Sequence, residues 1–184
     1  MKPARLQTER LVLDQPTDAD IDRVTEFCQD PLFERFMVTP WPYTTSDAVG
    51  FIVDYVPRAW DRGDEFSWAI RANGEFIGMI GFRAAGSALG YWIGAPHRRR
   101  GYVTEAVRAV LDWLFASGID EILWECFVAN VSSAAVARKN GFRFTGEGES
   151  IIPARDGSHP PALHAVISAT DSRTPKPGWP ATVA

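Results

Sequence analysis

The clearest pattern in the chain is a helical repeat of apolar side chains between residues 102 and 118. Apolar residues recur there three and four positions apart, which is the spacing of one buried helix face. Gly118 is a typical residue to end that helix. The stripe consists of Val103, Ala106, Val107, Val110, Leu111, Leu114 and Phe115.

The rest of the chain alternates between strand-like apolar runs and shorter helical stripes. The Asn73-Gly74 pair separates two such runs and predicts a tight hairpin. Residues 17–20 and 45–46 are predicted helix starts, and Pro57 is expected to break or kink the second of these helices. The predicted strands are 10–14, 66–71, 75–83, 88–94, 121–129, 142–147 and 163–169, with a first helix ending near residue 29, a loop over 31–43 and a short helix over 133–139.

This order of elements predicts a mixed α/β (α+β) fold in a single domain over residues 1–170. Residues 171–184 contain three prolines and little periodicity, so they are predicted to form a disordered, proline-rich C-terminal tail. The chain has 184 residues, of which 46% are hydrophobic and 23% charged, as expected of one globular domain. The formal net charge of −4 argues against a general nucleic-acid-binding surface.

Composition also disfavours several other classes of protein. The first residues contain no apolar signal segment, and no apolar run approaches the length of a membrane span, so no membrane association is expected. Cys28 and Cys126 are the only cysteines and lie far apart in the sequence, which argues against a disulfide framework. A reducing cytoplasm is therefore the expected location. No spacing of His, Cys and Asp indicates a metal site.

A basic turn directly precedes the long helix. Residues 90–94 end a predicted strand, and residues 97–101 follow as a turn that contains three consecutive arginines. The first N–H groups of a helix lack partners and carry partial positive charge, so a basic turn at this point favours a bound anion. Gly101 would let that anion approach the backbone closely. The alternative is a solvated basic turn before an amphipathic helix.

The basic turn resembles motif A of the GNAT superfamily, the acyl-coenzyme A-dependent N-acyltransferases. Arg98 and Gly101 match the motif, whereas Val103 stands where the family has Gly or Ala and could crowd a pyrophosphate. Residues 124–142 resemble motif B of the same superfamily, in which a strand ends in Asn130 and a short helix follows. Two motifs in the family's order and separation are more specific than either one alone.

Two further segments resemble the RimJ/RimL branch of the superfamily, the ribosomal-protein N-terminal acetyltransferases. These are residues 7–13 and 39–43, and the whole likeness spans about residues 5–168. The resemblance implies a central, mostly antiparallel sheet flanked by helices, with splayed strands at the acyl-CoA site. It also implies transfer of an acetyl group from acetyl-CoA to a primary amine by direct attack in a ternary complex. The acceptor would be a protein N-terminus or a small-molecule amine, and a homodimer is compatible with the family.

The resemblance assigns most of the cofactor contacts to the two motifs. Backbone N–H groups of residues 92–94 would polarise the thioester carbonyl, Asn130 would bind the pantetheine arm, and Lys139 or Arg138 would reach the phosphates. Either Ser132 or Ser133 could cap the short helix. The cofactor-binding residues that follow from this are Trp92, Ile93, Gly94, Arg98, Arg99, Arg100, Gly101, Tyr102, Val103, Thr104, Asn130 and Lys139.

The catalytic residues follow less directly, because residues 87–89 lack the carboxylate that many relatives carry just before the Gly-Tyr pair. Glu125 matches the position of a catalytic Glu in other N-terminal acetyltransferases and is the predicted base. Ser133 matches a serine proposed as the proton donor in the RimL-type branch. Each has an ordinary alternative, namely an ion-pair partner for Glu125 and a helix cap for Ser133. Other candidate bases are Glu147, Glu149, His164 and a chain of water molecules.

Two other interpretations stay open at this point. The missing acid is compatible with a non-catalytic acyl-CoA-binding or sensing module, and residues 98–100 are compatible with a nucleotide- or nucleic-acid-binding domain. Cys126 is expected to be a buried apolar side chain rather than a nucleophile. Several side chains could form either the wall of an acceptor pocket or part of the core, and they are Met37, Trp41, Tyr43, Trp60 and Trp68.

Overall fold

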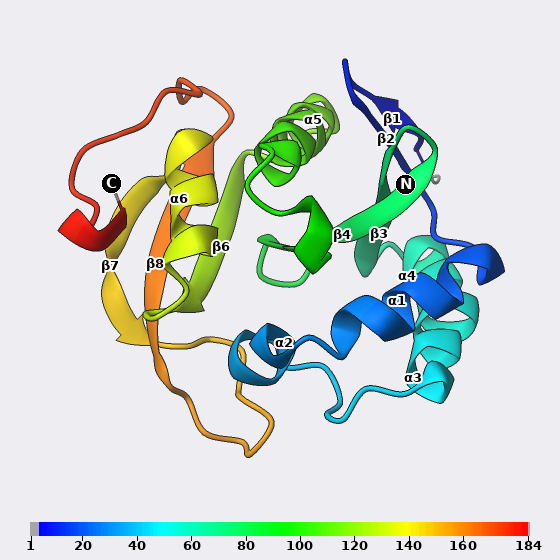
Figure 1. Cartoon of the computed structure of the whole chain (residues 1–184). Coiled ribbons are helices and arrows are strands. Elements are labelled where there is room, and N and C mark those ends of the chain that lie inside the picture. Colours follow the sequence, from blue (N-terminus) through cyan, green and yellow to red (C-terminus); the bar gives the residue numbers. More distant parts are fainter. Residues whose placement is uncertain (1–3, 184) are drawn as a thin grey trace.

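The computed structural model describes residues 4–183 and builds them around one eight-stranded sheet (Figure 1). The strand order is β1-β2-β3-β4-β5-β6-β8-β7, and every neighbouring pair is antiparallel except β5 with β6. The predicted mixed, mostly antiparallel sheet is thereby confirmed. The strands are β1 (Leu6–Gln7), β2 (Leu11–Asp14), β3 (Glu65–Ala72), β4 (Glu75–Arg83), β5 (Ala88–Ile93), β6 (Glu121–Phe127), β7 (Arg143–Glu149) and β8 (Pro161–Ser168).

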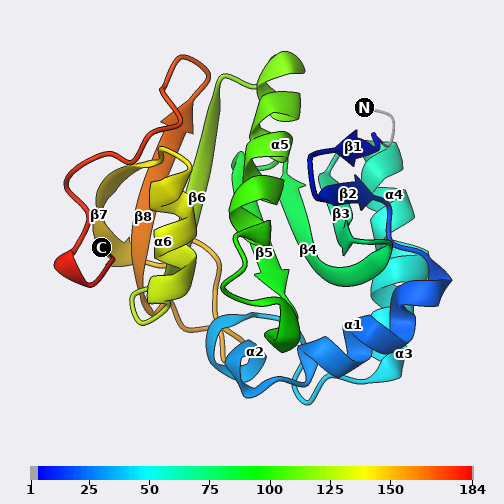
Figure 2. The same ribbon diagram turned by 45° about the horizontal axis from the view of Figure 1, so that its top comes forward.

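Helices cover both faces of this sheet. The long helix α5 and the short helix α6 lie in front of it in Figure 2, and α1 and α3 pack on the other face. The helices are α1 (Ile21–Cys28), α2 (Pro31–Phe36), α3 (Thr45–Val49), α4 (Val56–Arg62), α5 (Tyr102–Ala116) and α6 (Val131–Lys139).

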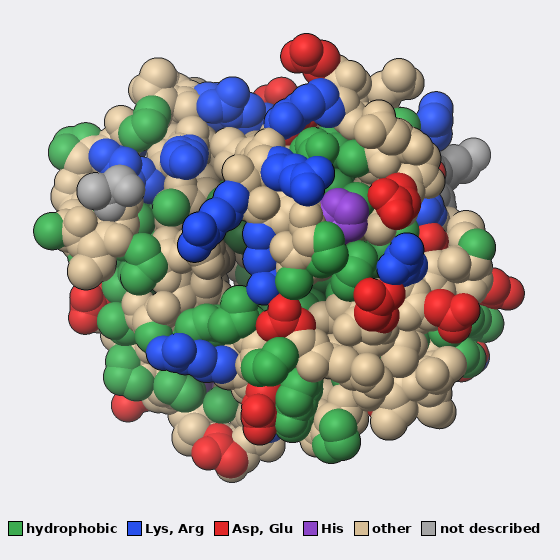
Figure 3. Space-filling model, viewed as in Figure 1, with side chains coloured by type: hydrophobic (Ala, Val, Ile, Leu, Met, Phe, Trp, Pro, Cys, Tyr) green, Lys and Arg blue, Asp and Glu red, His purple; other side chains and the backbone are tan. Residues whose placement is uncertain are grey.

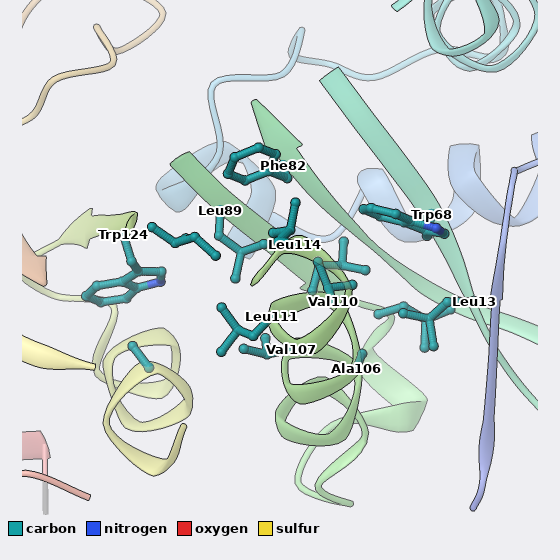
Figure 4. Packing of buried hydrophobic residues seen from close by; sticks show 14 of the residues in the cluster. Leu13, Trp68, Phe82, Leu89, Ala106, Val107, Val110, Leu111, Leu114 and Trp124 are labelled. Carbon is teal, nitrogen blue, oxygen red and sulfur yellow. The ribbon is translucent and has the colours of Figure 1, made fainter. Parts of the chain in front are cut away.

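The two-residue period of the strands divides their side chains between two apolar cores. Trp68 and Phe82 point toward α5 and share one apolar cluster with its residues Val110 and Leu114 (Figure 4). Met79, on the opposite face of β4, packs instead with residues of α1 and α3. Burying each large apolar side chain contributes about 1.5–3 kcal/mol, so both helical layers hold the central strands in fixed register.

The central strands β5 and β6 separate soon after they meet. They pair only where Ala88 lies opposite Leu123, and the Leu123 N–H donates to the Ser87 carbonyl at 2.8 Å. Beyond this point both strands continue for several residues without a ladder between them. The predicted splayed strands are confirmed, and the opening between them lies beside the N-terminus of α5 (Figure 2).

The segment 31–43, predicted as a loop, contains the helix α2. The Asp30 side chain caps it by accepting from the Leu32 N–H at 2.8 Å, and Pro31 occupies the first helical position. Proline is favoured there because its missing N–H would have no partner. The helix has six residues, too few for a period to stand out in the sequence.

Pro57 was expected to break or kink its helix, and the structure shows a helix that is not broken there. A π-helical segment, Gly50–Tyr55, precedes it, and helical structure then continues through α4 to Arg62. A wider turn before a proline gives its ring room and removes the need for the N–H that proline lacks. The helix ends at Gly63, whose φ is +75°.

The C-terminal segment was expected to be disordered, but its described residues pack on the domain. The Trp179 indole donates to the Phe142 carbonyl at 3.2 Å, and its ring lies 5.8 Å from that of Trp124. Val183 is buried. Trp179 and Val183 supply the apolar surface that packs on the domain. The prolines and polar residues around them lower the average hydrophobicity of the segment, so the sequence pattern did not reveal this packing.

Candidate functional site

Two cavities meet at the opening between β5 and β6. The first, of about 620 Å³, lies beside α5 and α6, and the second, of about 250 Å³, lies on the opposite face of the sheet. Four residues line both of them, and these are Phe36, Met37, Tyr91 and Trp92. The splayed strands therefore join two chambers across the sheet.

The first cavity is strongly basic. Its wall carries the side chains of Arg98, Arg99, Arg100 and Lys139 and no carboxylate, and basic side chains gather around a hollow on this face (Figure 3). Arg98 is held by Asp30, with Nη2 and Oδ2 3.0 Å apart. Every predicted cofactor-binding residue except Gly94 lines this cavity.

The turn before α5 has the backbone that an anion site requires. Gly101 has a φ of +79°, and Arg99 also has a positive φ of 62°. These left-handed residues turn the chain sharply into α5, whose first N–H groups have no partners within the helix. The site combines those N–H groups with four basic side chains, which suits a polyanionic ligand.

Glu105, in the first turn of α5, braces this turn from behind. Its carboxylate accepts from the Thr8 hydroxyl and forms a salt bridge of 2.6 Å with Arg10. Burial alone would raise the pKa of Glu105, but the hydrogen bonds from Thr8 and Arg10 bring it below its ordinary value. Arg10 also donates to the Arg100 carbonyl at 3.1 Å. Sequence reasoning overlooked this brace, because its members lie about 95 residues apart along the chain.

Gly94 does not have its predicted role, because its N–H donates to the Ile77 carbonyl at 2.9 Å. N–H groups alternate between the two sides of a strand, so this bond also directs the Trp92 N–H toward β4. The N–H groups of Tyr91 and Ile93 therefore face the opening. A Cβ atom at Gly94 would lie 2.6 Å from the Phe27 ring, so glycine is required there for close packing.

Asn130 lies at the start of α6 and is itself the N-cap of that helix. Its Oδ1 accepts from the Ser133 N–H at 3.3 Å and from the Ser132 hydroxyl at 3.2 Å. The expectation that Ser132 or Ser133 caps the helix was wrong. Asn130 and both serines line the first cavity.

Tyr91 is a site residue that the sequence interpretation did not single out. Its hydroxyl donates to the Ser133 carbonyl at 2.9 Å and accepts from the Ser133 hydroxyl at 3.3 Å. Burial is the main cause that raises the pKa of Tyr91. The two hydroxyl groups join β5 to α6 where the two cavities meet. The Gly90-Tyr91 pair could have drawn attention to Tyr91 in the sequence. Its contact with Ser133 could not be foreseen, because the two residues are 42 positions apart in the chain.

Glu125 lines the second cavity, with a side chain that is 15% exposed. Its two carboxylate oxygens accept from the N–H groups of Ile151 at 2.8 Å and Ile152 at 3.0 Å. His164 Nδ1 lies 3.5 Å from one of these oxygens. The carboxylate thus fixes the start of the loop between β7 and β8. The alternative bases Glu147 and Glu149 are exposed and line neither cavity.

The middle of the same loop is tied to α2 (Figure 1). The Arg155 guanidinium donates to the carbonyls of Met37 at 2.7 Å and Thr39 at 3.2 Å, and to that of Glu34. Carbonyl groups at the end of a helix lack partners, so this arginine completes the end of α2. The loop and α2 therefore form one wall over the second cavity, through Ile152 and Met37.

Most of the aromatic residues considered for an acceptor pocket belong to the core. Tyr43, Trp60 and Trp68 are buried, and Trp60 packs edge-on against Trp68 with ring centroids 5.0 Å apart. Of the five candidates, only Met37 lines either of the two cavities described above.

Cys126 is a free thiol on β6 and donates weakly to the Asn130 carbonyl at 3.5 Å. Burial raises its pKa to about 12, which keeps the thiol protonated at neutral pH. This agrees with its interpretation as a largely buried apolar side chain.

Comparison with known proteins decides the family. A model of the acetyltransferase (GNAT) domain matches residues 10–143. The chain belongs to the GNAT acetyltransferase family. Membership of this family makes it an acetyl-CoA-dependent N-acetyltransferase. Within residues 4–183, no group of His, Cys, Asp and Glu is placed to hold a metal ion, and no helix is long and apolar enough to cross a membrane.

Relatives of this GNAT chain agree with the assignment. It is 27% identical over 148 residues to the uncharacterized N-acetyltransferase YoaA of Bacillus subtilis (strain 168), which covers 77% of this chain and 84% of YoaA. Its fold matches RimL, a ribosomal L7/L12 alpha-N-protein acetyltransferase in complex with coenzyme A, with a TM-score of 0.79 and 18% identity over 90% of this chain and 98% of RimL. It also matches the microcin C7 self-immunity acetyltransferase MccE in complex with acetyl-CoA and AMP, with a TM-score of 0.76 and 22% identity over 88% of this chain and 93% of MccE.

Proposed function

We propose that this protein transfers an acetyl group from acetyl-CoA to a primary amine by direct attack in a ternary complex. The observation that carries the proposal is the meeting of two cavities of different charge at the splayed strands. The first cavity is lined by four cationic side chains, whereas the second is lined by two carboxylates and one guanidinium. A polyanionic cofactor suits the first, and an amine suits the second.

Several residues support binding of acetyl-CoA along the first cavity. The turn at Arg98–Thr104 and the start of α5 would hold the pyrophosphate. Lys139, at the end of α6, would reach another phosphate group, and Asn130 would bind the pantetheine arm. The N–H groups of Tyr91 and Ile93 face the opening, so these two are placed to polarise the thioester carbonyl.

The proton path needs a base for the amine and an acid for the leaving thiolate. Glu125 is our candidate base, because its carboxylate lines the second cavity and has acceptor capacity beyond its two backbone hydrogen bonds. Ser133, coupled to Tyr91, is our candidate acid on the side of the cofactor. The acceptor in this proposal is a protein N-terminus or a small-molecule amine.

The decisive experiment is a turnover screen with acetyl-CoA against N-terminal peptides and small amines, read by release of free thiol. We expect acceptor-dependent release with at least one amine class. Tight binding of acetyl-CoA without turnover on any amine would instead indicate a non-catalytic acyl-CoA-binding module.

A further inference from the structure

Two glycines lie opposite each other on the central strands of the sheet, on the face that holds the second cavity. Gly81 of β4 pairs with Gly90 of β5, and both line that cavity. Neither has a positive φ, so the backbone does not demand glycine at either position. A Cβ atom at Gly90 would meet no other atom within 4 Å. The missing side chains therefore leave a bare strip of sheet in the cavity.

This strip leads to a buried carboxylate on β3. Glu65 Oε2 accepts from the Tyr55 hydroxyl at 2.9 Å and from Arg83 Nε at 3.0 Å. Its Oε1 accepts from the Ser67 hydroxyl at 3.1 Å. A Cβ atom at Gly81 would lie 3.3 Å from the Ser67 hydroxyl oxygen and 3.4 Å from that same Oε1. Both side chains therefore lie close against Gly81 at the end of the strip, and Oε1 is the less occupied oxygen of Glu65.

The charge around the strip favours a cation. The charged side chains of the second cavity are Glu65, Arg83 and Glu125, two negative and one positive. Arg83 is paired with Glu65, and its side chain is 48% exposed, so water screens much of its charge. The Glu65 side chain is only 10% exposed, and a buried carboxylate oxygen with a free lone pair gains most from a charged donor.

The distance along the strip sets the size of the ligand. Trp92, where β5 faces the opening, follows Gly90 by two residues, or about 7 Å along the strand. Glu65 Oε1 lies above Gly81, one strand away from Gly90, which adds about 5 Å at a right angle. The two ends of the strip are therefore about 9 Å apart by this geometry.

We propose that the amine acceptor is a diamine-like molecule that lies over Gly81 and Gly90. Its remote ammonium group donates to Glu65 Oε1, while its other amine lies at the opening between β5 and β6. This inference rests on the proposed function, and it adds the class of acceptor and two residues that select it. Gly90 selects by leaving space, and Glu65 selects by charge.

The test compares three probes of matched length with the full-length protein, namely cadaverine, pentylamine and δ-aminovalerate. We expect kcat/KM for cadaverine to exceed that for pentylamine by about tenfold or more, the usual scale of one charged hydrogen bond. Glu65→Gln should remove that preference and leave the affinity for acetyl-CoA unchanged. Equal rates with cadaverine and pentylamine would overturn the proposal, and so would a preference for δ-aminovalerate, which would assign the strip to Arg83.

Gly90→Ala tests the strip separately, because its methyl group enters open space and does not disturb packing. We expect the KM for cadaverine to rise about tenfold with little change in the affinity for acetyl-CoA. Gly50→Ala is the matched control, since its Cβ also meets nothing within 4 Å and Gly50 lines neither cavity. Glu121→Gln, on an exposed residue of β6, is the control for Glu65→Gln. An unchanged KM in Gly90→Ala would place the acceptor elsewhere.

Calorimetric titration of the coenzyme A complex separates this inference from the proposed function. If no amine is acetylated, the proposed function fails, and binding of cadaverine still decides the site. Binding of cadaverine that is tighter than that of pentylamine and is weakened by Glu65→Gln supports the strip as a diamine site. Equal binding of the two probes refutes it. Circular dichroism and thermal unfolding of each variant establish that the fold is retained.

Discussion

The side-chain hydroxyl groups of Tyr91 and Ser133 lie 3.3 Å apart and join β5 to α6 beside the opening in the sheet. Their second contact, from the Tyr91 hydroxyl to the Ser133 carbonyl at 2.9 Å, fixes the tyrosine ring in place. Under the proposed function, these two coupled hydroxyl groups would pass a proton to the leaving thiolate.

The first prediction concerns this pair. Ser133→Ala should lower kcat about tenfold, because water can replace the hydroxyl group as proton donor. Tyr91→Phe should have a similar effect, and the double variant should lose little more than either single one, since both act on the same step. Steady-state turnover at saturating acetyl-CoA measures this, with Ser117→Ala at the far end of α5 as the control. Fully additive losses would show that the two hydroxyl groups act independently.

The second prediction concerns the anion site at the start of α5. Gly101→Asp places a side chain and a negative charge where the pyrophosphate is expected, and it also strains a residue with a φ of +79°. We expect the affinity for acetyl-CoA to fall more than tenfold, or by more than about 1.4 kcal/mol. Calorimetry measures this change.

Gly118→Asp is the matched control for that variant. Gly118 follows the other end of α5 and has a φ of +87°, so the same substitution produces similar backbone strain far from the basic turn. Unchanged affinity in Gly101→Asp, with an intact circular dichroism spectrum, would exclude the turn as the pyrophosphate site.

The parts of the fold that local pattern determines could be predicted from the sequence. The stripe of α5 and the Asn73-Gly74 hairpin depend on neighbours only a few residues apart. The basic turn was recognisable for the same reason, since three arginines and Gly101 are consecutive or nearly so. Trp179 could not be placed, because its partners Trp124 and Phe144 lie on strands far away in the chain.

The candidate site was only partly predictable, because much of it is assembled by strand register. Nothing near Glu65 in the sequence indicates that it faces Gly81, and nothing near Gly94 indicates that its N–H is already bonded to Ile77. Asn130 lines the first cavity, but its role as the cap of α6 depends on backbone angles that composition does not reveal.

The third prediction follows from the buried thiols. Burial raises the pKa of Cys28 and Cys126 to about 12, so their reactive thiolate forms are scarce at neutral pH. Thiol-reactive dye should label neither cysteine in the native protein at pH 7 and both after unfolding in guanidinium. Rapid labelling of native Cys126 would contradict its buried environment.

The same shifts predict how stability changes at alkaline pH. The folded pKa of each thiol is raised above its unfolded value, so the protonated form contributes stability that is fully present below about pH 9. That contribution is lost as the pH rises toward about 12. Urea unfolding of Cys28→Ala and of the unmodified protein between pH 8 and about pH 11 tests this, since the variant should lose less stability over that interval. Parallel losses would exclude Cys28 as a source of the pH dependence.

The last prediction concerns Glu125, for which the proposed role as a base is separable from the observed role as an anchor of the loop. As a base it would take a proton from an amine that is mostly charged at neutral pH, and as an anchor it accepts the N–H groups of Ile151 and Ile152. Glu125→Gln should lower kcat about 100-fold, the usual scale for a general base, with the affinity for acetyl-CoA nearly unchanged.

The pH dependence distinguishes the two roles of Glu125. Loss of a base should shrink at high pH, where the amine is already neutral, whereas a displaced loop should impair turnover equally at every pH. Arg155→Ala provides the comparison, because it frees the middle of the loop from Met37 and Thr39 without touching the carboxylate. If Glu125→Gln and Arg155→Ala show parallel losses at every pH, Glu125 is an anchor, and ordered water becomes the candidate base, since Glu147 and Glu149 lie outside both cavities.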